Sequence, residues 1–104
     1  MLWIATSAPA MTLRELSALE KSGAQGPNYL RYYLVGVMEG VLEAHAQAVR
    51  AGAKPTVCLN GRRLEPRMAQ GIFEAERKRN AEVYEADMSV QLVMFNALAT
   101  AYAC

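Results

Sequence analysis

NYLRYYLVGVMEGVLEAHAQAVR, residues 28–50, repeats apolar side chains at the i, i+3, i+4 and i+7 spacing that is typical of one face of a helix. The apolar positions are Leu30, Tyr33, Leu34, Val37, Met38, Val41 and Leu42. Pro27 or Asn28 can open this helix, because proline is tolerated in a first helical turn, and Gly52 can close it. The segment therefore predicts one long helix at the centre of the fold.

Two glycines inside this helix, Gly36 and Gly40, lie four residues apart and so share a face. Glycine in a helix interior costs about 1 kcal/mol relative to alanine. We therefore expect another helix backbone to cross closely at these helix-packing positions. The charged residues Arg31, Glu39 and Glu43 on the same helix argue against a membrane-spanning Gly-x-x-x-Gly motif.

Local signals outside this segment predict three further helices. Thr12 and Glu15 have the spacing of a capping box at the start of the first helix. A helix with proline in its first turn begins near Pro66, and its charged side chains, including Glu76, are expected to form a solvated face. Ser89, or Asp87 before it, can cap a last helix that is apolar almost all round, which predicts a central place in the core.

The two cysteines, Cys58 and Cys104, are far apart in the chain. With a single histidine they cannot make a four-ligand zinc site unless carboxylates join at unsupported spacings. We expect a structural disulfide that ties the carboxyl end to a central loop, which in the chain-entropy model contributes about 4 kcal/mol. The alternative is a pair of unrelated free thiols in a cytosolic protein.

The first ten residues, MLWIATSAPA, are apolar, small and uncharged. Ala8-Pro9-Ala10 has the A-x-A pattern of a signal-peptidase site, and Leu2–Ala5 has the character of the end of a signal's apolar region, but a basic region is missing. Residues 1–10 are thus either a signal-peptide remnant or a frayed terminus. The predicted single helical domain covers residues 11–104.

Together these signals predict an all-α fold, a compact bundle of about four helices with one intrachain disulfide. The chain has 104 residues, 53% of them hydrophobic, which is enough for one core. Its net charge of +1 is too small to attract nucleic acid over long range. The same small charge causes little electrostatic repulsion between copies of the chain, so a homodimer is a reasonable expectation. No apolar run approaches the roughly 20 residues needed to cross a bilayer.

The motifs of common catalytic sites do not occur in the sequence. It contains no phosphate-binding glycine loop, G-x-S-x-G, H-E-x-x-H or C-x-x-C. The single histidine, His45, lies within the long helix and is interpreted as a helix-surface or half-buried structural residue. Glu39 and Glu43 form an i, i+4 carboxylate pair that we interpret as solvent-facing. We predict no catalytic residue, cofactor or metal site, and hence no enzyme.

Four motifs in a fixed order resemble the Rap/Tai immunity family of type VI secretion. They are YLRYYLVGVMEG at 29–40, CLNG at 58–61, a helix near Pro66 with Gln70, and ALATAYAC at 97–104. The family patterns are Y-x-x-G-V-x-x-G, C-x-P-x-G, a helix with glutamine near its start, and A-L-x-x-A-[FY]-P-C. The resemblance covers about residues 12–104.

The chain departs from the family pattern in its prolines and in its cysteines. Asn60 and Ala103 stand where the family has proline, and the further cysteines common in the family's amino-terminal half are missing. The two remaining cysteines, Cys58 and Cys104, match the family's loop and terminal cysteines, so the resemblance implies that they pair.

The resemblance implies a periplasmic helical protein, often a homodimer, whose partner is a peptidoglycan-cleaving amidase toxin that it neutralises by covering the active-site cleft. It directs attention to two exposed loops, 60–63 and 82–87, as partner-binding segments. The candidate contact residues are Asn60, Arg62, Arg63, Glu82, Tyr84 and Glu85. The arginines suit an acidic rim, and Tyr84 suits an amphipathic anchor. The competing interpretation is that both segments are ordinary solvated loops.

Two other functions compete with the immunity hypothesis. One is a periplasmic helical stress or chaperone protein of the HdeA type without a toxin partner, which would expose apolar surface in acid. The other is an enzyme, which the sequence favours least.

Overall fold

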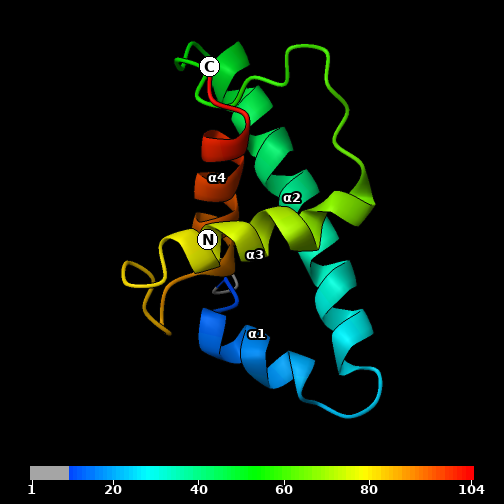
Figure 1. Ribbon diagram of the computed structural model, residues 1–104. Helices are drawn as coiled ribbons and strands as arrows, with labels where there is room; N and C mark the ends of the chain where they lie inside the picture. The colour runs from blue at the N-terminus through cyan, green and yellow to red at the C-terminus, as the bar shows by residue number, and fades with distance from the viewer. Residues whose placement is uncertain (1–9) are drawn as a thin grey trace, which may run out of the picture.

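The computed structural model describes residues 10–104, which form four α-helices and one short 3₁₀ helix (Figure 1). In chain order the elements are α1 (Leu13–Glu20), α2 (Gly26–Arg50), η1 (Pro66–Met68), α3 (Ala69–Arg79) and α4 (Val90–Ala101). The described residues contain no strand, only two isolated antiparallel bridges, Thr12 with Ser89 and Val57 with Ala103. The predicted all-α fold is confirmed, whereas the interpretation of the amino terminus falls on residues of which 1–9 lie outside the described part.

Local capping places the helix starts as the sequence predicts. The Thr12 hydroxyl accepts a hydrogen bond from the Glu15 amide at 3.1 Å, and the Glu15 carboxylate accepts one from the Thr12 amide at 3.1 Å. Pro27 lies in the first turn of α2, and the Ser89 hydroxyl caps α4 by accepting from the Leu92 amide at 3.1 Å. These contacts satisfy amides that a helix start leaves without an intrahelical partner.

The junction between α1 and α2 depends on the glycine with which α2 begins. Gly26 is buried and begins α2 directly against the end of α1. A Cβ at this position would collide with the carbonyl oxygen of Glu20. The absence of a side chain therefore sets the close approach of the two helices.

The four helices pack around α4 and the middle of α2. In Figure 1, α2 and α4 run side by side in the upper part, α3 crosses in front of them, and α1 packs under the first half of α2. The helix α4 contacts both α2 and α3 and buries five residues, as its apolar character predicts. The core side chains with at most 1% exposure include Leu16, Leu34, Met38, Phe73, Val90, Val93, Met94 and Leu98.

One residue expected on the solvated face of α3 is instead buried. Glu76 is only 2% exposed, because it continues the inward-facing row of Ala69 and Phe73 at helical spacing. Its carboxylate accepts hydrogen bonds from Arg79 at 2.6 Å, Asn80 at 2.8 Å and the Tyr84 hydroxyl at 2.6 Å. Three donors compensate the buried charge.

The ionisation of this cluster follows from its contacts. Desolvation by burial would raise the pKa of Glu76, but the hydrogen bonds from Tyr84, Asn80 and Arg79 outweigh it and leave that pKa below its ordinary value. Burial, together with donation to the Glu76 carboxylate, raises the pKa of Tyr84. The cluster is thus held with an ionised glutamate and a neutral tyrosine at neutral pH.

Among residues 10–104, no helix combines the length and the apolar character needed to cross a membrane.

Candidate protein-interaction surfaces

The loop between α2 and η1, residues 51–65, is fastened to the carboxyl end of α4. Cys58 and Cys104 form a disulfide with a Cα–Cα distance of 4.8 Å, which confirms the predicted pairing. The Cys58 amide donates to the Tyr102 carbonyl at 2.7 Å, and Val57, 7% exposed, bridges to Ala103. The loop is therefore covalently and sterically fixed at its middle.

A second anchor of this loop comes from α2. The His45 Nε2 accepts hydrogen bonds from the backbone amides of Thr56 at 3.1 Å and Val57 at 3.3 Å. The ring is half-buried, in line with the structural role that the sequence suggested. The contact itself carries no motif, because its donors are backbone groups that every residue except proline possesses.

The tip of the loop is a tight turn at Asn60 and Gly61. The Arg62 amide donates to the Leu59 carbonyl at 3.0 Å, and the two residues between them have φ of 53° and 80°. Positive φ at both central positions is what a type I′ turn requires, and asparagine and glycine adopt it most readily. Asn60 is exposed at this tip, as expected for a candidate contact residue.

The two candidate arginines of the loop behave differently. The Arg62 guanidinium donates to the carbonyls of Leu59 at 2.9 Å and Cys58 at 3.2 Å, and lies 4.8 Å from the centroid of the Tyr102 ring. Its charge stays exposed, but its donors are partly used inside the loop. Arg63 is also exposed and follows directly. The loop therefore presents two neighbouring positive charges.

The second candidate segment, between α3 and α4, is exposed except at its tyrosine. Glu82 and Glu85 are exposed, whereas Tyr84 is half-buried and its hydroxyl donates to Glu76 and accepts from Asn96 at 3.1 Å. The polar end of Tyr84 is thus engaged inside the protein. The exposed large apolar side chain of this segment is Val83, at 60%, which the sequence did not single out.

The structure does not bring the two candidate loops into one surface. Arg62 lies at the carboxyl end of α4 beside Tyr102, whereas Tyr84 contacts Asn96 near the middle of that helix. One loop precedes α3 and the other follows it, and in Figure 1 they leave opposite ends of this helix.

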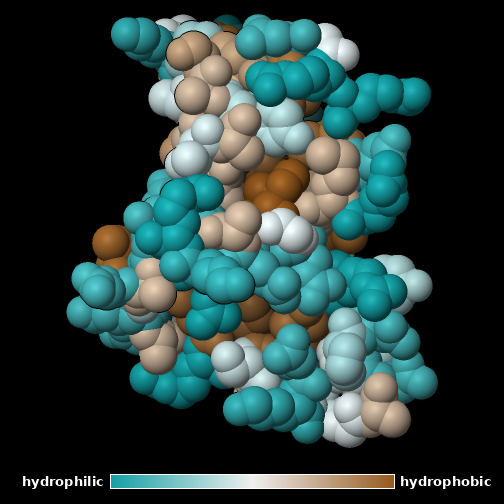
Figure 2. Space-filling view, viewed as in Figure 1, coloured by the Kyte–Doolittle hydropathy of each residue, from teal (hydrophilic) through white to brown (hydrophobic). Residues whose placement is uncertain are grey.

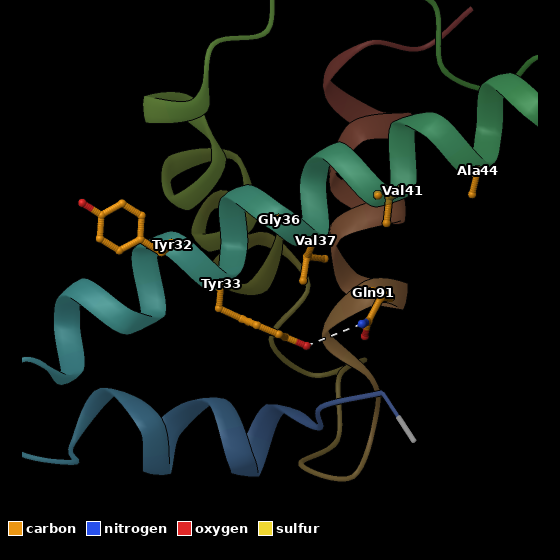
Figure 3. Close-up of a pocket in the computed structure, with 8 residues that line it drawn as sticks. Tyr32, Tyr33, Gly36, Val37, Val41, Ala44 and Gln91 are labelled. Atoms are coloured by element: carbon orange, nitrogen blue, oxygen red, sulfur yellow. Dashed lines mark hydrogen bonds between the residues drawn. The ribbon is translucent and has the colours of Figure 1, made fainter. Parts of the chain in front are cut away.

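A surface groove that the sequence did not predict runs between α2 and α4 (Figure 3). Two adjoining hollows of about 540 and 550 Å³ share Val41, Ala44 and Gln91 in their walls. Tyr33 crosses the groove from α2, and the Gln91 amide of α4 lies 3.5 Å from its hydroxyl. The neighbouring Tyr32 points away from Tyr33 and is 75% exposed. The walls are mainly apolar, which is typical of binding surfaces.

The two helix-packing glycines lie in this groove. A Cβ built at Gly36 or Gly40 would meet no atom within 4 Å, and both residues are exposed. The expected close approach of another helix is therefore not made by any helix of residues 10–104. The spacing of the glycines correctly identified a shared face, but in this chain the face is open.

The face that carries α3 has a different character. Figure 2 shows mostly hydrophilic side chains on it, with apolar atoms visible in a hollow between α2 and α4 above α3 and again below α3, toward α1. The three basic residues Arg77–Arg79 lie in the last turn of α3, where positive charge complements the helix dipole.

In the part of the chain that the structure describes, no group of three or more histidine, cysteine, aspartate or glutamate side chains is placed to hold a metal ion. Comparison of the chain with protein-family models, with curated proteins and with solved structures gave no match. The resemblance to the Rap/Tai immunity family therefore rests on the ordered motifs of the sequence.

Proposed function

We propose that the protein is a periplasmic immunity protein that binds and inhibits a peptidoglycan-cleaving amidase effector of type VI secretion. The observation that carries the proposal is the Cys58–Cys104 disulfide, which joins the two cysteines that match the loop and terminal cysteines of the Rap/Tai pattern. Disulfides persist in oxidising compartments such as the bacterial periplasm, where such an effector would act.

The loop 51–65 is the proposed inhibitory surface. It is held by the disulfide, by the amide of Cys58 on Tyr102 and by two amides on His45, so little conformational entropy is lost when it binds. Its exposed arginines, Arg62 and Arg63, provide positive charge for an acidic rim around a cleft. A rigid, charged loop of this kind suits a protein that covers an active site.

The segment 82–85 and the expected homodimer belong to the same proposal. Glu82 and Glu85 carry negative charge on a separate surface, and Val83 places an exposed apolar group between them. A second partner contact or a second copy of the chain can use these surfaces or the open groove. Sedimentation of the purified chain over a range of concentrations distinguishes monomer from dimer.

Affinity capture with the tagged full chain in its own organism tests the proposal. We expect a small cell-wall amidase to come down in stoichiometric amounts. Replacing Arg63 by glutamate should weaken its binding about tenfold or more, because the charge at the contact is reversed. Arg31→Glu, an equal charge change on an exposed part of α2, is the matched control and should bind as the parent does.

A chaperone-type function is the second candidate, and the apolar groove between α2 and α4 is the observation that favours it. It predicts that the protein suppresses aggregation of unfolded clients in acid and captures a broad set of proteins rather than one amidase. The same capture experiment, repeated at low pH, separates the two functions.

A further inference from the structure

In the first half of the loop 51–65, beyond the amides that close the end of α2, the hydrogen bonds to another element are made to one side chain, His45. The Ala53 amide closes the end of α2 on the Ala48 carbonyl at 2.9 Å, and the next amides with hydrogen-bond partners in the described structure are those of Thr56 and Val57, both on His45. Residues 51–56 are otherwise exposed. The imidazole is therefore the contact that holds residues 54–56 against α2.

Two backbone N–H groups donate to the Nε2 atom of His45, and this geometry determines the protonation state of the ring. The lone pair of Nε2 has to be free, so the ring is neutral and carries its hydrogen on Nδ1. An imidazolium would place a hydrogen on Nε2 facing the hydrogens of both amides. Protonation thus removes two hydrogen bonds and replaces them with repulsion.

We propose that His45 is a pH-operated latch, which holds residues 54–56 against α2 at neutral pH and releases them in mild acid, opening the groove between α2 and α4. Histidine is the side chain that ordinarily changes charge between about pH 5 and pH 8. The donors are backbone amides, so they can form hydrogen bonds with water once the His45 acceptor is lost.

The surroundings of His45 favour release over retention of the imidazolium. The groove walls beside it come from α2, from the loop and from α4, and the only ionisable side chain among those wall residues besides His45 is Lys54, which has the same sign as the imidazolium. The nearest carboxylate in sequence, Glu43, is exposed and accepts from Gln47 at 3.2 Å and Arg50 at 3.3 Å. Among the described residues, no carboxylate lines the groove to hold a protonated ring in place.

The release stays local. Lys54 and Thr56 form part of one wall of the groove, so their departure widens it, whereas Ala53 stays bonded to the Ala48 carbonyl. The disulfide at Cys58 and the Cys58 amide on the Tyr102 carbonyl do not titrate in this range and keep the rest of the loop attached. The latch changes the shape of an apolar surface while the helices remain folded.

Amide hydrogen exchange of the full chain, measured by NMR at about pH 7.5 and about pH 5 and corrected for intrinsic rates, tests the latch. We expect the protection of the Thr56 and Val57 amides to fall about tenfold or more in acid, in step with titration of the His45 ring. The amides of Ala53 and Cys58, whose acceptors are carbonyls, should keep their protection. The ring nitrogen shifts should show hydrogen on Nδ1 at neutral pH.

Two variants separate titration from packing. His45→Gln keeps an acceptor oxygen that does not titrate and should make the protection of both amides independent of pH, and His45→Phe should leave them unprotected at both pH values. Unchanged protection in the parent while His45 titrates, or hydrogen on Nε2 at neutral pH, would overturn the proposal. The measurement uses no partner, so its failure would not bear on the immunity function, nor would failure to find an amidase bear on the latch.

Discussion

At the scale of single residues, Glu76 places a charged carboxylate in the core, where three hydrogen-bond donors stabilise it. Replacing it by glutamine should lower the free energy of unfolding at neutral pH by about 2–3 kcal/mol, because a neutral amide cannot accept all three bonds that the carboxylate accepts. Urea unfolding measures this loss. Glu74→Gln, a change at an exposed neighbour on α3, is the control and should stay within about 0.5 kcal/mol.

The pH dependence of this loss has a definite sign. The folded state lowers the pKa of Glu76, so its contribution to stability is complete above the pKa of the unfolded chain and is lost as the pH falls through the lower folded pKa. The difference between the parent and Glu76→Gln should therefore be full at about pH 7 and shrink as the pH falls below about 4.3, the ordinary pKa of a glutamate. A constant difference across this range would contradict the ionised state assigned to Glu76.

Tyr84 gives a second residue-scale prediction. Tyr84→Phe removes the donor to Glu76 and the acceptor of Asn96, which should lower the free energy of unfolding by about 1–2 kcal/mol. Burial and the neighbouring carboxylate raise the pKa of Tyr84, so absorbance titration should show one phenol that ionises above the ordinary tyrosine range and is missing from the variant. Tyr32→Phe, on an exposed ring, should leave the stability unchanged.

Residue-scale environments were the hardest to predict from the sequence. Glu76 has the appearance of an ordinary charged helix residue, and only the fold brings Tyr84 and the end of α3 around it. The same holds for His45, whose donors are amides 11 and 12 residues further along the chain. Neither the Glu76–Tyr84 contact nor the His45 contact requires a recognisable pattern of side-chain types, so no sequence motif predicts either of them.

At the scale of elements, the glycines of α2 have two roles that the sequence does not distinguish: Gly26 allows a close approach of two helices, whereas Gly36 lies on an open face. Gly36→Ala should raise the free energy of unfolding by about 0.5–1 kcal/mol, because alanine favours the helix and its Cβ meets no atom of the described chain within 4 Å. Gly26→Ala should lower it, since the added Cβ collides with the Glu20 carbonyl. Thermal or urea unfolding at low protein concentration compares the two, and a destabilised Gly36→Ala would show that this face is covered.

The Cys58–Cys104 disulfide contributes to the stability of the fold by closing a long loop of the chain. Its sequence separation of 46 residues implies that reduction lowers the free energy of unfolding by about 4 kcal/mol, mainly by freeing the unfolded chain. Denaturation with and without a thiol reductant measures the effect. The double variant Cys58→Ser with Cys104→Ser should be insensitive to reductant, and an equally stable reduced parent would contradict the assigned role.

The helices themselves were predictable because their signals are local. The capping box at Thr12, the proline in the first turn of α2, the proline at η1 and the cap at Ser89 act within one turn of each helix start. The path of the loop 51–65 was not predictable to the same degree, because its anchors on His45 and Tyr102 lie on other elements.

At the scale of the whole molecule, the fold separates a rigid charged loop from an apolar groove. The order of the motifs in the sequence pointed to the loop as a contact surface, and the structure adds the anchors that hold it. The groove between α2 and α4 was not predicted, because it is formed by two helices far apart in the chain and by the missing side chains of Gly36 and Gly40. The two surfaces suit a protein whose function is to bind.

The most direct test of the proposed function is an inhibition titration with the amidase that the tagged chain captures. Peptidoglycan cleavage is measured while increasing amounts of the purified protein are added. The proposal predicts that cleavage falls to the background level at about one chain per amidase, and that Arg63→Glu shifts the curve to higher concentrations. An amidase that keeps its full activity when saturated with the protein, or the absence of any amidase among the captured partners, would contradict the proposed immunity function.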